Sequence, residues 1–208
     1  MSDEGTGDKR RIRSERTREK LLDAAMHCYR EYGVSNTAME DVAQQAGVGR
    51  ATLYRHFNNQ EALITEVMAV NLKQIQARLR EQLKDCATAE DFFVDSAIII
   101  IRESHKRALT RLLFDEGSSA SMINRISFSD PNIVAMGSDL IAPFYDRAKT
   151  EGILRAWVTK PMLQEWASRV LLSFLMSPSP RLNNDRKMRK FFHDAIMPSI
   201  IHRPGSVV

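Results

Sequence analysis

Cysteine is scarce in this sequence. Cys28 and Cys86 are the only two among 208 residues, and they stand far apart. One such pair cannot build a disulfide framework or the paired thiolates of a structural zinc site. We interpret them as ordinary buried or half-buried thiols in a reducing compartment; a redox sensor is the alternative.

Long apolar runs are also missing. The longest uninterrupted one is Ala97–Ile101, whereas a membrane-spanning helix needs about 20 predominantly apolar residues. The charged N-terminus is not followed by the apolar segment of a secretory signal. We therefore expect a cytoplasmic protein that does not enter a membrane.

The sequence contains none of the usual signatures of catalytic or metal sites. It has no phosphate-cradling glycine loop, no nucleophile on a sharp turn and no pair of histidines at metal-ligand spacing. We expect no catalytic residue, no metal and no cofactor. The alternative, an enzyme on an all-helical scaffold, would need a convergent polar site, and the sequence does not indicate one.

Positive charge is concentrated in one segment. The chain has 30 Lys and Arg against 26 Asp and Glu, and seven of the twelve residues 9–20 are Lys or Arg. Such a run is either a solvated tail or an arm that lies against the phosphates of a nucleic acid. We favour the arm because a helix-turn-helix pattern follows it. Residues 1–14 are expected to form a disordered basic arm.

Apolar side chains recur at helical spacing in nearly every segment, and no segment shows convincing strand alternation. Hydrophobic residues make up 43% of the chain, which is enough to build a core. We therefore predict an all-α fold, with a loop over residues 116–130 that contains one helical turn near 122–126. The expected helices cover about residues 15–32, 38–46, 50–57, 60–84, 88–101, 106–115, 131–152, 161–176 and 185–201.

Residues 37–57 have the organisation of a helix-turn-helix, with a short helix, a glycine-containing turn and a second short helix. Thr37 and Glu40 have the spacing of a capping box. Apolar residues would fix the angle between the two helices: Val42, Ala43, Ala46, Val48, Leu53 and Phe57. A cation, hydroxyls and a phenol remain on the outer side and suit a DNA groove. These candidates are Arg50, Ala51, Thr52, Tyr54, Arg55 and His56.

Several motifs extend this pattern on both sides. The stretch Ala46–Phe57 is followed by Glu61-Ala62-Leu63 and preceded by the Thr37 cap, by Asp41-Val42-Ala43 and by the helix end from Ala24-Ala25 to Gly33. Over about residues 16–65 the chain closely resembles the TetR family of bacterial regulators. It departs from the family's pattern at Ala38, Gly49 and Gln60, and each departure removes a possible phosphate contact.

The resemblance implies a three-helix helix-turn-helix DNA-binding domain over residues 15–60, and a helical domain over 61–208 that senses a ligand and dimerises. It implies a transcriptional regulator, a repressor that a small-molecule ligand releases from a palindromic DNA operator. The alternative is a ligand-independent DNA-binding regulator or an activator. The resemblance also adds Thr37 and Gln60 to the expected DNA-binding residues.

The larger domain is expected to hold a small apolar or aromatic ligand between its middle helices. The candidate lining residues are Phe92, Phe93, Phe114, Met136, Phe144, Tyr145 and Trp166. A homodimer is expected through the helices at about 161–176 and 185–201, which have broad apolar stripes. The candidate interface residues are Trp166, Val170, Phe174, Phe192 and Ile196.

Overall fold

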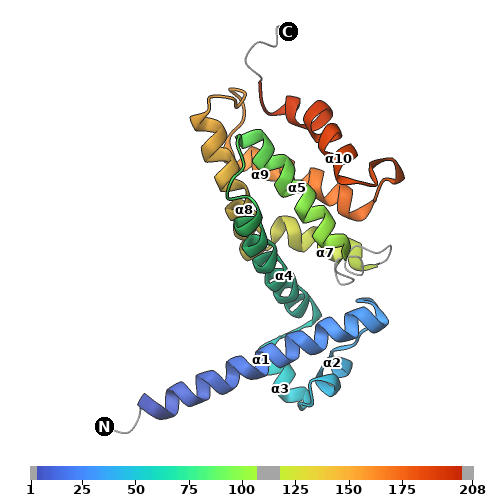
Figure 1. The fold of residues 1–208 in the computed structure, drawn as a ribbon. Helices are drawn as coiled ribbons and strands as arrows, with labels where there is room; N and C mark the ends of the chain where they lie inside the picture. Colours follow the sequence, from blue (N-terminus) through green and yellow to red (C-terminus); the bar gives the residue numbers. More distant parts are fainter. Residues whose placement is uncertain (1–3, 107–117, 203–208) are drawn as a thin grey trace.

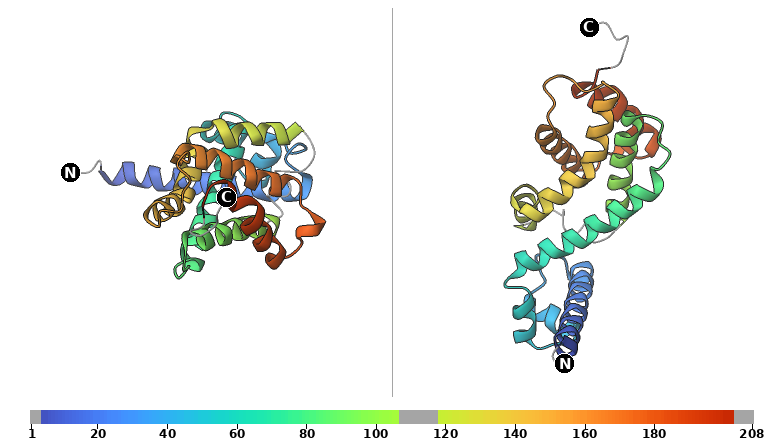
Figure 2. Two further views of the ribbon diagram at one scale, coloured as in Figure 1. Left: turned by 90° about the horizontal axis from the view of Figure 1, so that it is seen from above. Right: turned by 90° about the vertical axis from the view of Figure 1, so that its left-hand side faces the viewer.

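The computed structural model describes residues 4–106 and 118–202, and this part of the chain is built from helices and the turns between them. A small helical head lies at one end and a larger helical bundle at the other (Figures 1 and 2). The all-α fold predicted from apolar spacing is confirmed. Within these residues, β pairing is limited to an isolated bridge between Leu154 and Ile201.

Three helices form the head: α1 (Glu4–Tyr32), α2 (Met39–Gln45) and α3 (Arg50–His56). The second half of α1 packs along α2, whereas its first half projects beyond the head (Figure 1). The next helix, α4 (Gln60–Gln82), leaves the head and continues into the bundle. The side view in Figure 2 shows α4 as the helical connection between the two parts.

The bundle packs around α5, which contacts α4, α8 and α9. Its long helices are α5 (Ala89–Lys106), α7 (Ser118–Ser129), α8 (Pro131–Thr150) and α9 (Lys160–Met176). The chain ends in shorter elements: the 3₁₀ turn η1 (Pro180–Leu182), α10 (Asp185–Phe191), the π turn η2 (Phe192–Ile196) and the 3₁₀ turn η3 (Met197–Ser199).

The first helix begins earlier than the sequence predicts. It starts at Glu4, so the expectation of a disordered arm over residues 1–14 is wrong from there on. Arg, Lys and Glu are good helix formers, and Arg11 pairs with Asp8 one turn away at 3.1 Å. The basic run is therefore the exposed surface of a helix.

Two other expectations about the helices are wrong. The serine-rich segment expected as a loop is α7, whose Ile123 and Ile126 are buried against the head. The helix expected over 185–201 instead changes to a π turn at Phe192 and to a 3₁₀ turn that contains Pro198, a residue that cannot continue the helical hydrogen bonding. The short helix expected over 106–115 lies outside the described residues after Lys106.

The head and the bundle share a core. The cluster that fills the head contains Leu21, Leu53 and Leu63, and it also contains Ile123 and Ile126 of α7 and Ile133 of α8. A second cluster fills the far part of the bundle around Phe144 and Phe192. Apolar side chains from the bundle therefore complete the interior of the head.

Tyr29 is buried at the centre of the head with no exposed surface. Its hydroxyl finds no hydrogen-bond partner among the residues that the structure describes. Burial raises the pKa of this phenol well above its usual value, so it stays protonated. A buried polar group without a partner destabilises the fold by about 1–3 kcal/mol.

Tyr29→Phe is therefore expected to raise the free energy of unfolding by about 1 kcal/mol, because it removes the unsatisfied hydroxyl and keeps the ring. Urea unfolding followed by circular dichroism measures the change. Tyr32→Phe is the matched control, since Tyr32 is 58% exposed and its hydroxyl can reach water. A Tyr29→Phe protein less stable than the wild type would mean that the hydroxyl has a partner.

Candidate nucleic-acid interface and interior cavity

The turn between α2 and α3 has the hydrogen bonds of a Schellman motif. The Val48 N–H donates to the Ala43 carbonyl at 3.0 Å, and the Gly47 N–H donates to the Gln44 carbonyl at 3.0 Å. Gly47 has a φ of 65°, in the left-handed region that glycine adopts without strain. This turn ends α2 and directs the chain into α3.

Apolar contacts fix α2 and α3 against each other as predicted. Leu53 is fully buried, and Val42 and Phe57 are almost so. Ala46 and Val48 pack at the edge of the same cluster. The outer residues of α3 are exposed or half-buried: Arg50, Ala51, Thr52, Tyr54, Arg55 and His56. The helix-turn-helix geometry thus leaves these six candidates accessible.

Arg50 is the most constrained of these accessible side chains. Its guanidinium pairs with the Glu40 carboxylate at 3.0 Å and lies 5.4 Å from the centre of the Tyr54 ring. These contacts hold the cation across the outer side of both helices. The Glu40 carboxylate also partly neutralises it, so an approaching phosphate has to compete for the guanidinium.

Arg18 anchors α1 to the other end of α3. Its guanidinium lies 5.4 Å from the centre of the Phe57 ring and pairs with Glu66 of α4 at 2.7 Å. Burial, followed by the charges of Arg55 and Arg18, lowers the pKa of His56. At neutral pH the imidazole is therefore mostly uncharged and acts as a hydrogen-bonding group.

Thr37 does not cap α2, so the capping box expected from it is wrong. The N-cap residue is Ala38, whose N–H donates to the Asp41 carboxylate at 2.8 Å. The Thr37 hydroxyl donates to the Gly33 carbonyl at 2.8 Å, and the residue is buried. Its side chain is therefore occupied inside the head, and its assignment as a DNA-binding residue is corrected.

The amide nitrogen of Gln60 is turned inward in this half-buried side chain, and the DNA contact expected of the residue stays a prediction. Its amide nitrogen donates to the Val34 carbonyl at 3.1 Å and to the Thr37 carbonyl at 3.0 Å. The side chain thereby ties the first turn of α4 to the loop between α1 and α2. Glutamine at this position supports the connection between the head and the bundle.

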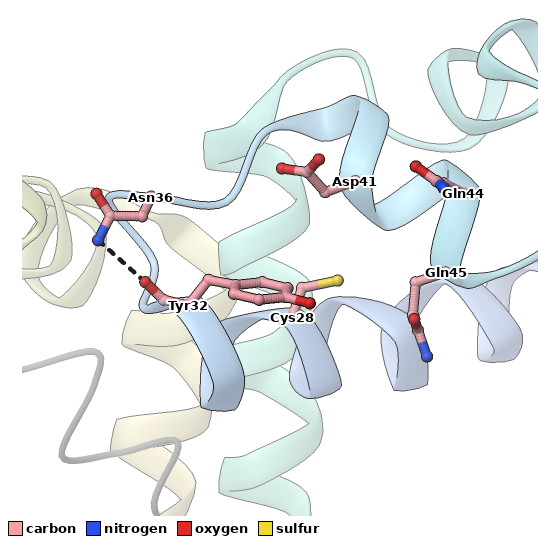
Figure 3. Close-up of a pocket in the computed structure, with 6 residues that line it drawn as sticks. All are labelled: Cys28, Tyr32, Asn36, Asp41, Gln44 and Gln45. Carbon is pink, nitrogen blue, oxygen red and sulfur yellow. Dashed lines mark hydrogen bonds between the residues drawn. The ribbon is translucent and has the colours of Figure 1, made fainter.

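A groove that the sequence does not predict lies between α1 and α2 (Figure 3). It is lined by Cys28, Tyr32, Asn36, Asp41, Gln44 and Gln45. Burial, followed by the charge of Asp41, raises the pKa of the Cys28 thiol, which keeps it protonated. Both cysteines are free, and the Cys28 side chain is a neutral, poorly reactive part of the groove wall.

A cavity of about 170 Å³ lies inside the bundle. Its wall includes Phe92, Phe93 and Phe144 from the candidates named above. The structure does not bring Met136, Tyr145 or Trp166 into the described wall, and Phe114 lies outside the described residues. Trp166 packs instead on Phe93, with the ring centres 5.8 Å apart.

The sequence analysis missed the wall residues that come from α4, α7 and α9. One face of α4 contributes Met68, Asn71, Leu72, Ile75 and Leu79. Their spacing of three and four residues is a helical stripe and could have identified them. Ser127 of α7 and Gln164 of α9 also line the cavity, but isolated polar residues carry no such signal.

The candidate interface residues divide into two groups. Phe192 is fully buried and stacks on Phe174, with ring centres 5.2 Å apart. Its assignment to a dimer interface is wrong, because the chain's own core already encloses it. Trp166, Val170, Phe174 and Ile196 are half-buried against that core. Phe191, which was not predicted, is 36% exposed beside them.

In residues 4–106 and 118–202, no cluster of His, Cys, Asp and Glu has the arrangement of a metal site. In the same ranges, no helix combines the length and apolar character needed to cross a bilayer.

The head resembles known proteins in sequence. Residues 21–67 match the family model of bacterial regulatory proteins of the tetR family. The transcriptional regulator UidR of Escherichia coli K12 is 28% identical over 111 residues, which cover 53% of this chain and 56% of that protein. The match thus spans about half the length of that relative.

Solved structures resemble the chain over most of its length. A TetR-family transcriptional regulator from Pectobacterium atrosepticum has a TM-score of 0.66 at 15% identity, over 93% of this chain and 98% of that one. NalD, the secondary repressor of the MexAB-OprM efflux pump in Pseudomonas aeruginosa, has a TM-score of 0.58 at 22% identity, over 92% and 99%. At these identities the likeness establishes the fold alone.

Gln60→Ala is expected to lower the free energy of unfolding by about 1–3 kcal/mol, because it leaves two half-buried carbonyls without their donor. Urea unfolding measures the loss. Gln45→Ala removes an exposed glutamine from the same head and is the control, with an expected change within about 0.5 kcal/mol. Equal stability of the two variants would contradict the anchoring role of Gln60.

Proposed function

Because the chain belongs to the tetR family of bacterial regulatory proteins, we propose that it is a transcriptional repressor that binds a palindromic DNA operator and leaves it when a small molecule fills the cavity. A regulator of this kind acts on DNA in the cytoplasm. We keep the division into a basic arm (1–14), a DNA-binding domain (15–60) and a ligand-sensing and dimerising domain (61–208), with the arm helical from Glu4.

The main support for this proposal is that the core of the head and the wall of the cavity share two residues. Met68 of α4 and Ile133 of α8 are part of the head's core and also part of the cavity wall. A molecule in the cavity contacts side chains that pack against the DNA-binding helices. Ligand-independent binding and activation are the alternatives, and this shared packing favours ligand control.

A second connection runs alongside the shared core. Arg125 of α7 pairs with Glu61 of α4 at 2.8 Å, one residue after the Gln60 anchor. Ser127, two residues further along α7, lines the cavity. A displacement of α7 by a ligand would therefore act on the first turn of α4. The ligand releases DNA only if it binds the DNA-free arrangement more tightly than the DNA-bound one.

The outer side of α3 is the proposed reading surface in the DNA major groove. Arg50 supplies a cation there, and the Thr52 and Tyr54 hydroxyls supply hydrogen-bonding groups. The basic residues of the projecting part of α1 are exposed and suit contacts to phosphate. Binding at a palindrome requires two such heads, which a homodimer provides.

Arg50→Ala is expected to weaken operator binding by about 1–3 kcal/mol, because it removes a cation from the groove. An operator is first selected from a pool of random duplexes, and affinity is then measured by fluorescence anisotropy at fixed salt. Arg80→Ala carries the same charge change at an exposed site near the far end of α4 and should retain affinity within about twofold. Equal losses in both variants would indicate a general charge effect and count against α3 as the reading helix.

We propose a homodimer through α9, α10 and η2, with Phe191 within the interface and four half-buried residues at its edge: Trp166, Val170, Phe174 and Ile196. Phe191→Glu is expected to yield monomers, because a desolvated carboxylate opposes association. It should keep the helical content, since the wild-type side chain is already partly exposed. Light scattering measures the mass. Tyr32→Glu, an exposed tyrosine in the head, should remain dimeric; a dimeric Phe191→Glu protein would place the interface elsewhere.

A further inference from the structure

The cavity is small, and its two ends differ in polarity. We infer that its ligand is an uncharged molecule with a single ring and one hydroxyl group, bound with the hydroxyl toward the head. This inference rests on the proposed function of the cavity as the ligand site, and it names the class of molecule that the wall can hold.

Size limits the ligand to one ring. The cavity measures about 170 Å³, whereas sites for drug-sized molecules span about 300–1,000 Å³. An apolar protein cavity of about 150 Å³ binds benzene. A single ring with one or two small substituents therefore fits without displacing the helices.

The end of the cavity away from the head is mostly apolar. It is lined by Leu79 near the end of α4, by Phe92 and Phe93 near the start of α5, and by Ile141 and Phe144 of α8. The hydroxyl of Ser96, which lies among these residues, already donates to the Phe92 carbonyl at 2.6 Å. The rings of Phe93 and Phe144 lie 4.8 Å apart with a tilt of 57°. Such a wall offers edges and faces against which a ring can pack.

Polar groups gather at the end near the head. Asn71 lies one turn after Met68, and Ser127 follows Ile126, so both adjoin residues of the head's core. Gln164 reaches the same region, because its amide nitrogen donates to the Val134 carbonyl at 2.6 Å, next to Ile133. The cavity therefore has a polar end directed at the head.

The hydrogen-bonding capacity of this end favours a hydroxyl. One N–H of the Gln164 amide donates to the Val134 carbonyl, and the amide still offers its carbonyl oxygen as an acceptor and its second N–H as a donor. The hydroxyls of Ser104, Ser127 and Ser168, which also line the cavity, can donate or accept. A ligand hydroxyl both donates to an amide oxygen and accepts from a serine, so it satisfies both kinds of group.

The described wall residues are all uncharged. A carboxylate or ammonium group that left water for such surroundings would lose its hydration without meeting an opposite charge. A phenol at neutral pH keeps its proton and avoids this penalty. The geometry thus selects a neutral hydroxyl compound over a charged molecule of the same shape.

A matched set of three probes tests the inference: 4-methylphenol, 1,4-dimethylbenzene and 4-methylbenzoate. Calorimetry on the full chain without DNA measures their affinities. We expect 4-methylphenol to bind about tenfold more tightly than the hydrocarbon, as one satisfied hydrogen bond predicts, and the carboxylate not to bind. The ligand class would be overturned if the phenol and the hydrocarbon bound equally, or if 4-methylphenol did not bind. Tighter binding of 4-methylbenzoate than of 4-methylphenol would also overturn it.

Two variants and one spectrum locate the site. Gln164→Leu should weaken the binding of 4-methylphenol about tenfold and change the affinity for 1,4-dimethylbenzene less than about twofold. If the Gln164→Leu protein does not fold, Ser127→Ala is measured in its place. With methyl-labelled methionine, 4-methylphenol should shift the NMR signal of Met68 in the wall and leave that of Met162, which is 50% exposed. An unshifted Met68 signal, or unchanged phenol affinity in the variants, would overturn the assignment.

The effect on DNA is measured separately, by anisotropy of the operator complex. If 4-methylphenol binds in the cavity and the DNA stays bound, the ligand class stands and ligand-induced release fails. If other compounds release the DNA while 4-methylphenol does not bind, the proposed function stands and the ligand class fails.

Discussion

The packing of Met68 and Ile133 between the head and the cavity is the contact on which the rest of the structure depends. These two side chains, with Ile123 and Ile126 of α7, complete an apolar core that α1, α2 and α3 leave open. A head of three helices exposes much of its apolar surface when it stands alone. The bundle therefore stabilises the head and fixes its orientation at the same time, and the two roles cannot be separated by a single substitution.

Polar contacts make this packing directional. Gln60 fastens the start of α4 to the loop after α1, and Arg18 fastens α1 to both Phe57 and Glu66. These contacts tie the head to the first turns of α4. Packed interiors change between discrete arrangements rather than deforming continuously. For this reason, we expect a small change in the cavity wall to alter the orientation of the head and not merely to loosen the packing near the cavity.

The sequence predicts the helices and the helix-turn-helix well, because apolar spacing, glycine turns and buried leucines are local signals. The inner residues Leu53 and Phe57 and the accessible candidates of α3 follow from helical geometry alone. Thr37 and Phe192 were assigned wrongly and the anchoring contacts of Gln60 were missed, since these roles depend on carbonyls and rings outside the local pattern. The helix α7 was missed for the same reason: its serines suggest a loop, and only burial of Ile123 and Ile126 against the head makes the helix favourable. The polar end of the cavity joins residues from four helices, α4, α5, α7 and α9, which spacing within one segment cannot reveal.

The helical structure of the projecting half of α1 affects the entropy that would be lost when this segment binds a nucleic acid. A flexible basic tail has to lose conformational freedom when it aligns with a charged polymer, at about 1–2 kcal/mol for each residue that becomes fixed. Here the backbone is already helical from Glu4, so that loss has occurred in the unbound protein. The residues from 4 to 20 span roughly 25 Å at the rise of an α-helix, comparable to about seven base pairs of duplex at 3.4 Å each. Their attraction to phosphate would come mainly from released counterions, with little of the heat-capacity change that accompanies coupled folding.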